Sequence, residues 1–498
     1  MTDRLKILVV ASEVEGLVKT GGLADVARAL PACLQAMGHD VRIVMPAYQR
    51  IREHWRDWPA QPMQLPLSLF ENHRVQARTG THAGLPMILL EHAPSFERPG
   101  VYDDGYGAFD DNPRRFAILS KGALAWCKAN DWQPDILHLN DWQSALAAFY
   151  LAEHYKDDAF FAHTRSLLSL HNAAYQGHAD ARWLQPLGIH EVFFRSEIFE
   201  DYGRINLLKG GIHFADGLNA VSPGYAEELV TDMGGHGLGA YFRARKNNLI
   251  GILNGCDYGQ WSPETDPDIA AQFHSIDDTG KAQCKIALQR EFKLAEKPVP
   301  LLVSISRLTD QKGFHLLIPA LENILKNEDI QVVLLGSGDA QLAAQLHSLE
   351  QRFPLKLRFV EGYDMALAHR LEAGGDAFLM PSLFEPCGLN QIYSLRYGTL
   401  PLVRHVGGLK NTVVAYNNDG SNLNTATGFS FLDPNANALQ QALEQLIQLY
   451  QTDPATWQQL QRNAMAQRFE WRDSAQQYVD FYRQLLATPR STSTTSKH

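Results

Sequence analysis

Residues 382–391 combine two reactive side chains with a glycine. The carboxylate Glu385 and the thiol Cys387 follow an apolar run that predicts a buried strand over residues 376–381, and helical spacing resumes after them. In parallel α/β sheets such strand-to-helix loops bind ligands. Gly388 leaves free N–H groups at the start of the next helix, which attract anions. The combination favours a ligand with hydroxyls and phosphates, such as a nucleotide sugar; alternatively, Glu385 only caps the helix.

Two cations lie on another predicted strand-end loop of the same half. A strand expected over residues 299–305 is followed by Arg307 and Lys312, and a helix is expected over residues 315–325. Two cations on one such loop can neutralise a diphosphate leaving group. The alternative, two solvated surface charges, is disfavoured because Glu385 stands further along the same half of the chain.

A third candidate loop lies near the start of the chain. Lys19, Gly21 and Gly22 follow a strand expected over residues 6–11 and precede a helix with one apolar face. The glycines allow a ligand to approach the backbone closely, and Lys19 adds a point charge. The loop is neither the dinucleotide fingerprint nor a P-loop, because the lysine precedes the glycines. A plain tight turn is the alternative.

Other predicted strands of the first half also end in polar residues, as expected where strand C-termini line a ligand cleft. These residues are Asp141, His171, Asn172 and Asn254. A lone histidine is more often part of the core than a catalyst, but His171 is followed directly by Asn172.

An aromatic and acidic loop at residues 102–106 either stacks on sugars or is solvated. Residues 266–268 have the Asp-x-Asp spacing of metal-dependent glycosyl transfer, but no strand precedes them and we expect them on the surface.

Length and composition limit the class of protein. A chain of 498 residues predicts two large domains. No apolar run is long enough to span a membrane, and the first residues do not predict a signal peptide. The five cysteines are scattered, which indicates a reducing compartment without disulfides or a zinc site. The formal net charge of −10 argues against a nucleic-acid partner.

The strand and helix pattern starts again in the second half, so we expect two doubly wound parallel sheets. The predicted domains are residues 1–255 and residues 256–470. A helix over residues 471–487 is expected to cross back to the first domain. Residues 488–498 are rich in Ser and Thr and are expected to be disordered.

Five motifs, at residues 19–26, 140–142, 171–172, 307–313 and 385–391, resemble those of bacterial glycogen synthases and plant starch synthases in type and order. The resemblance covers residues 6–486. It implies the GT-B fold, an α/β fold in which two Rossmann-like domains face each other across a cleft. It also implies retaining transfer of glucose, in bacteria usually from ADP-glucose, to the non-reducing end of an α-1,4-glucan. No metal or other cofactor, no membrane and a cytoplasmic location are expected.

The resemblance also assigns roles to residues. Lys19 and the amides of Gly21 and Gly22 should meet the diphosphate and the glucose. Arg307 and Lys312 should hold the diphosphate as it leaves, and Glu385 should lie against the sugar hydroxyls. The remaining assignments are Cys387, Gly388 and Leu389 near the donor, His171 at the glucose, Asp141 at the reacting face, Asn254 on the sugar or acceptor side, Tyr363 at the nucleotide, and Asp25 and Asn172 in substrate binding.

The chain departs from the family pattern at two positions. Asn140 and Gln143 replace histidines that the family commonly carries on either side of Asp141 and Trp142. Many related retaining transferases have a second glutamate eight residues after the first; Tyr393 stands there in this chain, with Gln391 nearby, which is closer to the glycogen synthase pattern. No acid pair predicts a nucleophile and an acid-base partner, so a front-face mechanism with the leaving phosphate as base is our hypothesis.

Four other functions compete with this one. A transferase with a small acceptor keeps the fold, but the Lys19 loop disfavours it. A glucan-binding regulatory protein without activity is disfavoured because Lys19, Arg307, Lys312 and Glu385 are all present. A nicotinamide dehydrogenase lacks its fingerprint. A polymer phosphorylase would need a pyridoxal phosphate lysine, which the sequence does not reveal.

Overall fold

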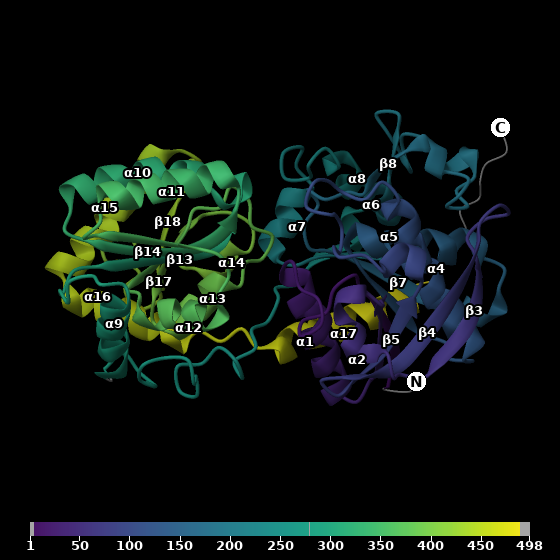
Figure 1. Ribbon diagram of the computed structural model, residues 1–498, viewed down its shortest axis with the longest axis horizontal. Helices are drawn as coiled ribbons and strands as arrows, with labels where there is room; N and C mark the ends of the chain where they lie inside the picture. Colours follow the sequence, from purple (N-terminus) through teal and green to yellow (C-terminus); the bar gives the residue numbers. More distant parts are fainter. Residues whose placement is uncertain (1–3, 278, 489–498) are drawn as a thin grey trace. The chain divides into compact units, whose positions relative to one another are not determined.

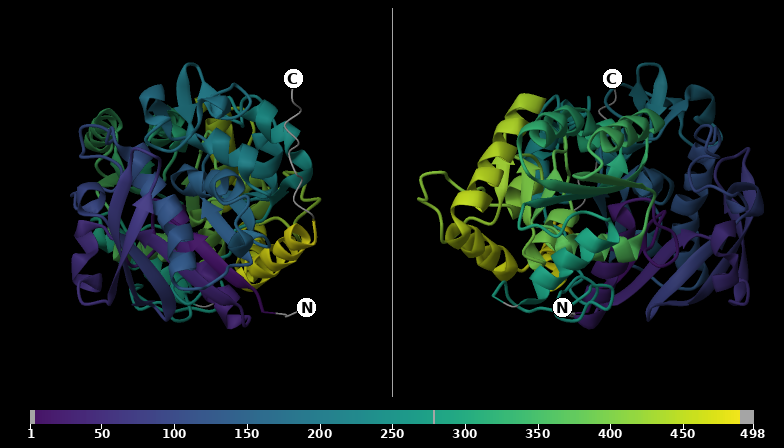
Figure 2. Two further views of the ribbon diagram at one scale, coloured as in Figure 1. Left: turned by 90° about the vertical axis from the view of Figure 1, so that its right-hand side faces the viewer. Right: turned by 60° about the vertical axis from the view of Figure 1, so that its left-hand side comes forward.

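The computed structural model describes residues 4–277 and 279–488. The chain forms two compact units. The first contains Met1–Asn254 and Trp471–His498, and the second contains Gly255–Glu470. The last helix, α17 (Trp471–Ala487), therefore belongs with the first half of the chain. Figures 1 and 2 show this yellow helix beside the purple elements of the first unit. Residues 489–498 of the expected disordered tail lie outside the described residues.

The first unit is built on a nine-stranded sheet with the order β12-β11-β7-β6-β1-β2-β5-β4-β3. Its parallel strands are β1 (Lys6–Val10), β2 (Asp40–Pro46), β5 (Leu85–Glu91), β6 (Ile136–Asn140), β7 (Arg165–Leu170), β11 (Gly217–Ala220) and β12 (Leu249–Gly251). The strand order reverses beside β1, because the chain first builds towards β2 and later towards β6. Ligands of such sheets bind at this switch point.

One edge of this sheet is antiparallel, which the sequence did not predict. The strands β3 (Ala60–Pro66) and β4 (Asn72–His82) pair with each other, and β4 pairs with β5. A two-residue turn at Ala83 and Gly84 joins β4 to β5, and both residues have positive φ, as tight hairpin turns require. The edge strand β3 alternates buried and exposed residues, since one of its faces meets solvent.

Helices and short strands complete the first unit. The helices are α1 (Gly22–Ala36), α2 (Arg52–Trp55), α3 (Ala93–Phe96), α4 (Asn112–Ala129), α5 (Asp141–Phe149), α6 (Leu207–Phe214), α7 (Pro223–Leu229), α8 (Gly239–Ala244) and α17. A small antiparallel sheet contains β8 (His178–Asp180), β9 (Glu200–Asp201) and β10 (Arg204–Asn206).

A buried polar network fixes α17 to the strands of the first unit. His138 of β6 contacts the hydroxyl of Tyr482 at 2.6 Å and that of Ser169 at 2.8 Å. Ser169 and Tyr478 both donate to Asn219 Oδ1 of β11, at 2.9 and 2.7 Å. All five side chains are buried. Because a buried polar group without its partner destabilises the fold, the network specifies one position of α17 on the strands of the first unit.

The second unit has a parallel six-stranded sheet with the order β15-β14-β13-β16-β17-β18. The strands are β13 (Leu301–Leu308), β14 (Gln331–Gly338), β15 (Leu357–Glu361), β16 (Ala377–Met380), β17 (Leu400–Arg404) and β18 (Phe429–Phe431). The order reverses between β13 and β16. β13 is three residues longer at its C-terminal end than predicted, so Arg307 belongs to the strand and not to the loop.

Helices cover both faces of this second sheet (Figure 1). They are α9 (Thr279–Glu291), α10 (Phe314–Asn327), α11 (Ala340–Arg352), α12 (Met365–Gly374), α13 (Asn390–Arg396), α14 (Leu409–Thr412), α15 (Ala436–Thr452) and α16 (Pro454–Ala466). Alternate strand residues enter two separate cores: Leu302 packs with α10 and α15, whereas Val303 packs with α9 and α12. Two buried faces explain the continuous apolar strand sequences. The prediction of two Rossmann-like units is confirmed.

Candidate functional site

The switch point of the second unit brings the two predicted loops of that unit together. β13 and β16 are neighbouring parallel strands, so the loops that follow them share one edge of the sheet. The backbone N–H of Leu383 donates to the carbonyl of Gln311 at 2.8 Å, and Gln311 Nε2 donates to the carbonyl of Phe384 at 3.2 Å. Gly313 has a φ of 72°, and a Cβ there would lie 2.1 Å from the carbonyl oxygen of Pro381. Only glycine permits this close approach.

Lys312 and Glu385 form an ion pair at this edge. Lys312 Nζ lies 2.6 Å from Glu385 Oε2, and the two side chains are 16% and 8% exposed. Ser382 donates a second hydrogen bond to the same oxygen at 2.9 Å. Within the described part of the chain, Glu385 Oε1 receives no hydrogen bond. The carboxylate is therefore held at one oxygen and free to accept at the other.

A buried glutamine shapes the loop that carries Glu385. Gln391 Nε2 donates to the carbonyls of Cys387 and Gly388 at 3.0 and 3.1 Å. Gly388 has a φ of 74°, and a Cβ there would meet Gln391 Oε1 at 2.4 Å. The N–H groups of Gly388 and Leu389 donate no hydrogen bond within the described residues. Two amides are thus available to an anion, as predicted from Gly388.

Arg307 and Tyr363 are placed differently from Lys312. The side chain of Arg307 is exposed and, among the described residues, forms no ion pair. Tyr363 follows β15, is 69% exposed, and its hydroxyl contacts the sulfur of Met365 at 3.7 Å. The structure therefore joins Lys312 to Glu385 but leaves these two side chains open to solvent.

The switch point of the first unit lies between β1 and β6. The loop after β1 carries Lys19, whose Nζ lies 2.7 Å from Asp25 Oδ1. Burial raises the pKa of Asp25, and Lys19 opposes this rise. Gly21 and Gly22 precede and begin α1, and a Cβ at either position would meet nothing within 4 Å. No close contact within the unit explains these two glycines.

Glu13 is a buried carboxylate that the sequence analysis missed. It is 3% exposed and accepts hydrogen bonds from the backbone N–H and the hydroxyl of Thr20, the latter at 2.6 Å. The hydroxyl of Tyr102 also donates to it. Tyr102 was predicted on a solvated or sugar-stacking loop, but its hydroxyl points inwards to Glu13. The available signal was an acidic residue placed between a buried strand and the Lys19 loop.

Asp141 begins α5 with an unusual backbone. Its φ is 54°, a left-handed conformation that Asp tolerates better than most residues. Its Oδ1 accepts the backbone N–H groups of His171 at 2.7 Å and Asn172 at 3.4 Å. Burial, with a smaller contribution from the charge of Glu13, raises the pKa of Asp141 to about 7. The structure thus brings Asp141, His171 and Asn172 together.

The two family departures near Asp141 are both buried. Asn140 contacts His171 Nε2 through its Oδ1 at 2.9 Å. Gln143 is 7% exposed, and its Oε1 has no hydrogen-bond partner among the described residues. Asn254 is the last residue of the first unit before the boundary; it is 5% exposed, and its Oδ1 likewise lacks a partner within the described ranges.

The Asp-x-Asp motif was predicted to lie on the surface, which is confirmed for Asp268 but wrong for Asp266. Asp266 is 2% exposed and accepts hydrogen bonds from His369 Nδ1 at 2.7 Å and from the hydroxyl of Tyr397. Its partner His369 is on α12, and its partner Tyr397 directly follows α13. The surface prediction rested on the absence of a preceding strand, and local sequence does not show these distant partners. Asp266, Asp268 and His369 lie close enough to hold a cation. However, the backbone N–H of Asp268 and the two side chains already occupy Asp266, so the group works as a structural network.

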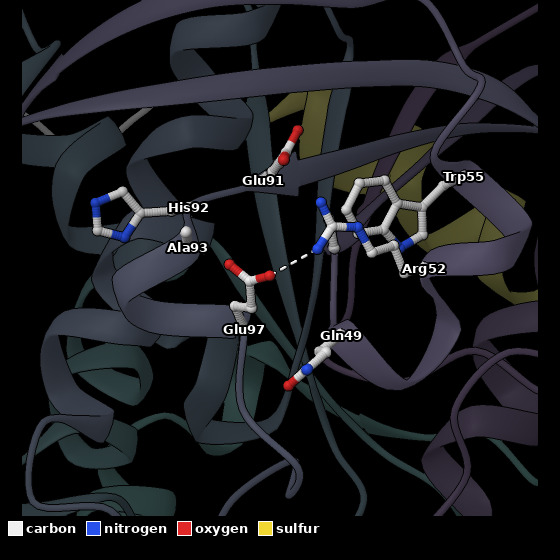
Figure 3. A pocket seen from close by; sticks show the side chains of 8 residues that line it. Gln49, Arg52, Trp55, Glu91, His92, Ala93 and Glu97 are labelled. Carbon is white, nitrogen blue, oxygen red and sulfur yellow. Dashed lines mark hydrogen bonds and ion pairs between the residues drawn. The ribbon is translucent and has the colours of Figure 1, made fainter.

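A small hollow lies in the first unit near the ends of β2 and β5 (Figure 3). Arg52 Nη1 and Glu97 Oε1 form an ion pair across it at 2.6 Å, and Glu91 is paired with Arg78. None of the predicted site residues lines it.

In the described part of the chain, no helix has the length and hydropathy needed to cross a membrane.

Two Rossmann-like units with charged and amide groups at their switch points are typical of nucleotide-binding α/β proteins, and the family matches assign this chain to the glycosyltransferases of the GT-B class. Residues 6–244 match the starch synthase catalytic domain family, and residues 286–465 match glycosyl transferases group 1. The glycogen synthase of Aeromonas salmonicida (strain A449) is 47% identical over 97% of this chain and 99% of its own length. The chain belongs to the glycogen synthase and starch synthase family.

Further relatives agree with this assignment. The glycogen synthase of Photobacterium profundum is 45% identical over 96% of this chain and 94% of its own length. Among solved structures, the catalytic domain of starch synthase IV from Arabidopsis thaliana, bound to ADP and acarbose, is 33% identical. It covers 97% of this chain and 100% of its own, with a TM-score of 0.88. A sucrose-phosphate synthase from Thermosynechococcus elongatus shares the fold, with a TM-score of 0.59 and 19% identity over 97% of this chain and 100% of its own.

Proposed function

We propose that this enzyme transfers glucose from ADP-glucose to the non-reducing end of an α-1,4-glucan with retention of configuration, without a metal or other cofactor. The Lys312–Glu385 pair beside the free amides of Gly388 and Leu389 carries the proposal. The Arabidopsis structure, bound to ADP and acarbose, supports the choice of nucleotide and of an oligosaccharide-like acceptor. We also propose a cytoplasmic enzyme, since all five cysteines are free thiols.

The donor side of the mechanism uses the second unit. Arg307 and Lys312 balance the charge of the diphosphate, and the amides of Gly388 and Leu389 bind its oxygens. Glu385 keeps one oxygen on Lys312 and accepts a sugar hydroxyl at the other. Cys387, a buried residue of the same loop, lies near the donor, and Tyr363 offers an exposed ring on which the nucleotide base stacks.

The acceptor side uses the first unit. Lys19 and the amides of Gly21 and Gly22 meet the diphosphate and the glucose, and Asp25 holds Lys19 through their ion pair. His171, Asn172 and Asn254 contact sugar hydroxyls, and Asp141 lies at the reacting face. In the front-face step the bond between C1 and the phosphate oxygen breaks while the acceptor oxygen bonds to C1. The acceptor hydroxyl proton passes to the leaving phosphate, so no enzyme nucleophile is needed.

Donor turnover on the purified protein tests the proposal. ADP-glucose and UDP-glucose are offered separately with glycogen, with and without EDTA, and chain elongation is followed. We expect elongation that is faster with ADP-glucose and unaffected by EDTA. Loss of activity with EDTA would contradict the absence of a metal. If neither donor extends glycogen, a transferase with a small acceptor becomes the better hypothesis.

A further inference from the structure

The Asn140 side chain connects three neighbouring strands of the first sheet at the switch point. Asn140 is the last residue of β6 and is 1% exposed. Its Nδ2 donates to the carbonyl of Val10, at the end of β1, at 3.1 Å. Its Oδ1 lies 2.9 Å from Nε2 of His171, which follows β7. Since β1, β6 and β7 are adjacent, one amide fixes the histidine ring relative to the two strands at the switch point.

These two contacts determine which ring nitrogen carries the proton. The carbonyl of Val10 can only accept, so the amide nitrogen of Asn140 must face it; the reversed amide would set two oxygens against each other. The amide oxygen that faces His171 also only accepts, so Nε2 must donate and therefore carries the hydrogen. In a neutral imidazole the other nitrogen, Nδ1, then has a lone pair and accepts.

The surroundings keep the His171 ring neutral. Burial lowers the pKa of His171 to about 3. Asp141 does not pair with the ring; its Oδ1 accepts the backbone N–H groups of His171 and Asn172. The other histidine nearby, His138 of β6, is held by Tyr482 and Ser169, and burial lowers its pKa to about 3 as well. Within the described residues, His171 Nδ1 has no partner.

We propose that Asn140 is a positioning residue that fixes His171 in the tautomer protonated at Nε2, so that Nδ1 accepts a hydrogen bond from a hydroxyl of the transferred sugar. The identity of the ligand rests on the proposed function, whereas the tautomer does not. A histidine at position 140, as the family commonly has, could donate or accept towards His171 and would not specify the tautomer. Asn140 therefore makes Nδ1 of His171 a hydrogen-bond acceptor, whereas a histidine at position 140 would allow either tautomer of His171.

Nitrogen NMR of the full-length protein, labelled with ¹⁵N-histidine, measures the tautomer directly. The His171 signal is assigned by its absence in His171→Gln. We expect wild-type His171 to be neutral at pH 7 with the proton on Nε2. Asn140→Leu should give a mixture of the two tautomers, because both polar contacts are lost. Wild-type His171 protonated at Nδ1, or an unchanged tautomer in Asn140→Leu, would overturn the proposal.

The matched control is Asn219→Leu, which removes a second buried asparagine of the same sheet that does not contact His171. With ADP-glucose and glycogen, Asn140→Leu should lower kcat about tenfold, the effect of one lost hydrogen bond in the transition state, with little change in the acceptor KM. The control should keep the tautomer and lose less kcat than Asn140→Leu, although it weakens the buried network that holds α17. Equal losses of kcat in both variants would mean that Asn140 has only a structural role. If wild type shows no glucosyl transfer but has the expected tautomer, the proposed function fails and the assignment of the proton stands.

Discussion

The ion pair between Lys312 and Glu385 can be tested at the scale of single residues. Lys312→Met leaves the Glu385 carboxylate buried without its cation, and we expect a loss of up to about 3 kcal/mol in the free energy of unfolding. The double variant Lys312→Met/Glu385→Gln should recover part of this loss, because no unpaired charge remains. Urea unfolding of the variants measures both values.

The exposed pair of Lys326 and Glu322 provides a control for this prediction. Their N–O distance is 2.7 Å, but their side chains are 51% and 29% exposed. Lys326→Met should therefore cost no more than about 0.5 kcal/mol. The prediction fails if Lys312→Met costs no more than this exposed control. Loss of transfer activity in Lys312→Met with a smaller loss in Lys326→Met would support the role of Lys312 at the diphosphate.

Asp141 predicts a pH dependence of stability. Burial raises its pKa in the folded state from the ordinary value of 3.8 to about 7, so the folded state binds the proton more tightly than the unfolded state. Stability is therefore lost as the pH rises from about 4 to about 7. Asp141→Asn cannot ionise, keeps an oxygen for the His171 N–H, and suits the positive φ.

We expect the melting temperature of Asp141→Asn to exceed that of the wild type by more at pH 8 than at pH 5. Because about two pH units of the shift lie above pH 5, the advantage of Asp141→Asn in unfolding free energy should grow by at most about 3 kcal/mol between pH 5 and pH 8. Calorimetry at both pH values measures it. If the difference in melting temperature between Asp141→Asn and the wild type does not depend on pH, Asp141 ionises normally in the folded state.

Residue types and positions were predictable from the sequence, but contacts between distant residues were not. Types and local spacing predicted that Lys312 and Glu385 lie on loops at one sheet edge, and the structure places them in contact. Spacing could not predict that the lysine is already paired while Arg307 remains open. Glu13 was missed because its partners, Thr20 and Tyr102, identify it only after the chain has folded.

At the scale of elements, the entry into α10 depends on Gly313. Its φ of 72° is strained for any other residue, and a Cβ would lie 2.1 Å from the Pro381 carbonyl oxygen. Gly38, which follows α1, has a φ of 97° but would meet nothing within 4 Å. Gly38→Ala should therefore cost about 1 kcal/mol from the backbone alone, and Gly313→Ala several times more.

Denaturation midpoints of the two glycine variants test this difference. Gly313→Ala should also lower kcat/KM, since it moves the neighbouring Lys312, whereas Gly38→Ala should leave kcat/KM unchanged. Similar midpoints for the two variants would mean that the loops after β13 and β16 can separate without cost.

Strand positions were largely predictable from the sequence because buried parallel strands are continuous apolar runs. β16 (Ala377–Met380) lies within the strand predicted over residues 376–381 and is one residue shorter at each end. The polar C-terminal part of β13, which includes Arg307, was not predicted as strand because its pairing with β14 is a tertiary contact. The β3–β4 hairpin was missed for a different reason: its strands are mostly polar, because one face meets solvent, so they form no continuous apolar run.

At the scale of the whole molecule, the second unit is one continuous segment, residues 255–470. Its sheet, its helices and its two hydrophobic cores all come from this segment. We therefore expect the isolated segment to fold, and to melt in one cooperative transition in calorimetry. Residues 1–470, which lack α17, should fold only the second unit, since the partners of His138 and Asn219 are missing. A native-like first unit in this truncated chain would contradict the importance of the buried network.

The position of α17 in the sequence has a consequence for synthesis on the ribosome. The first 254 residues emerge before the second unit, yet α17, which packs against α1 and β7 of the first unit, is translated after the second unit. Until then, the hydroxyls of Tyr478 and Tyr482 cannot reach Asn219 and His138, and the apolar surface around these side chains stays uncovered. The half that is made first is therefore completed only after the second unit has emerged, so nascent chains should depend on chaperones until residues 471–487 have left the ribosome.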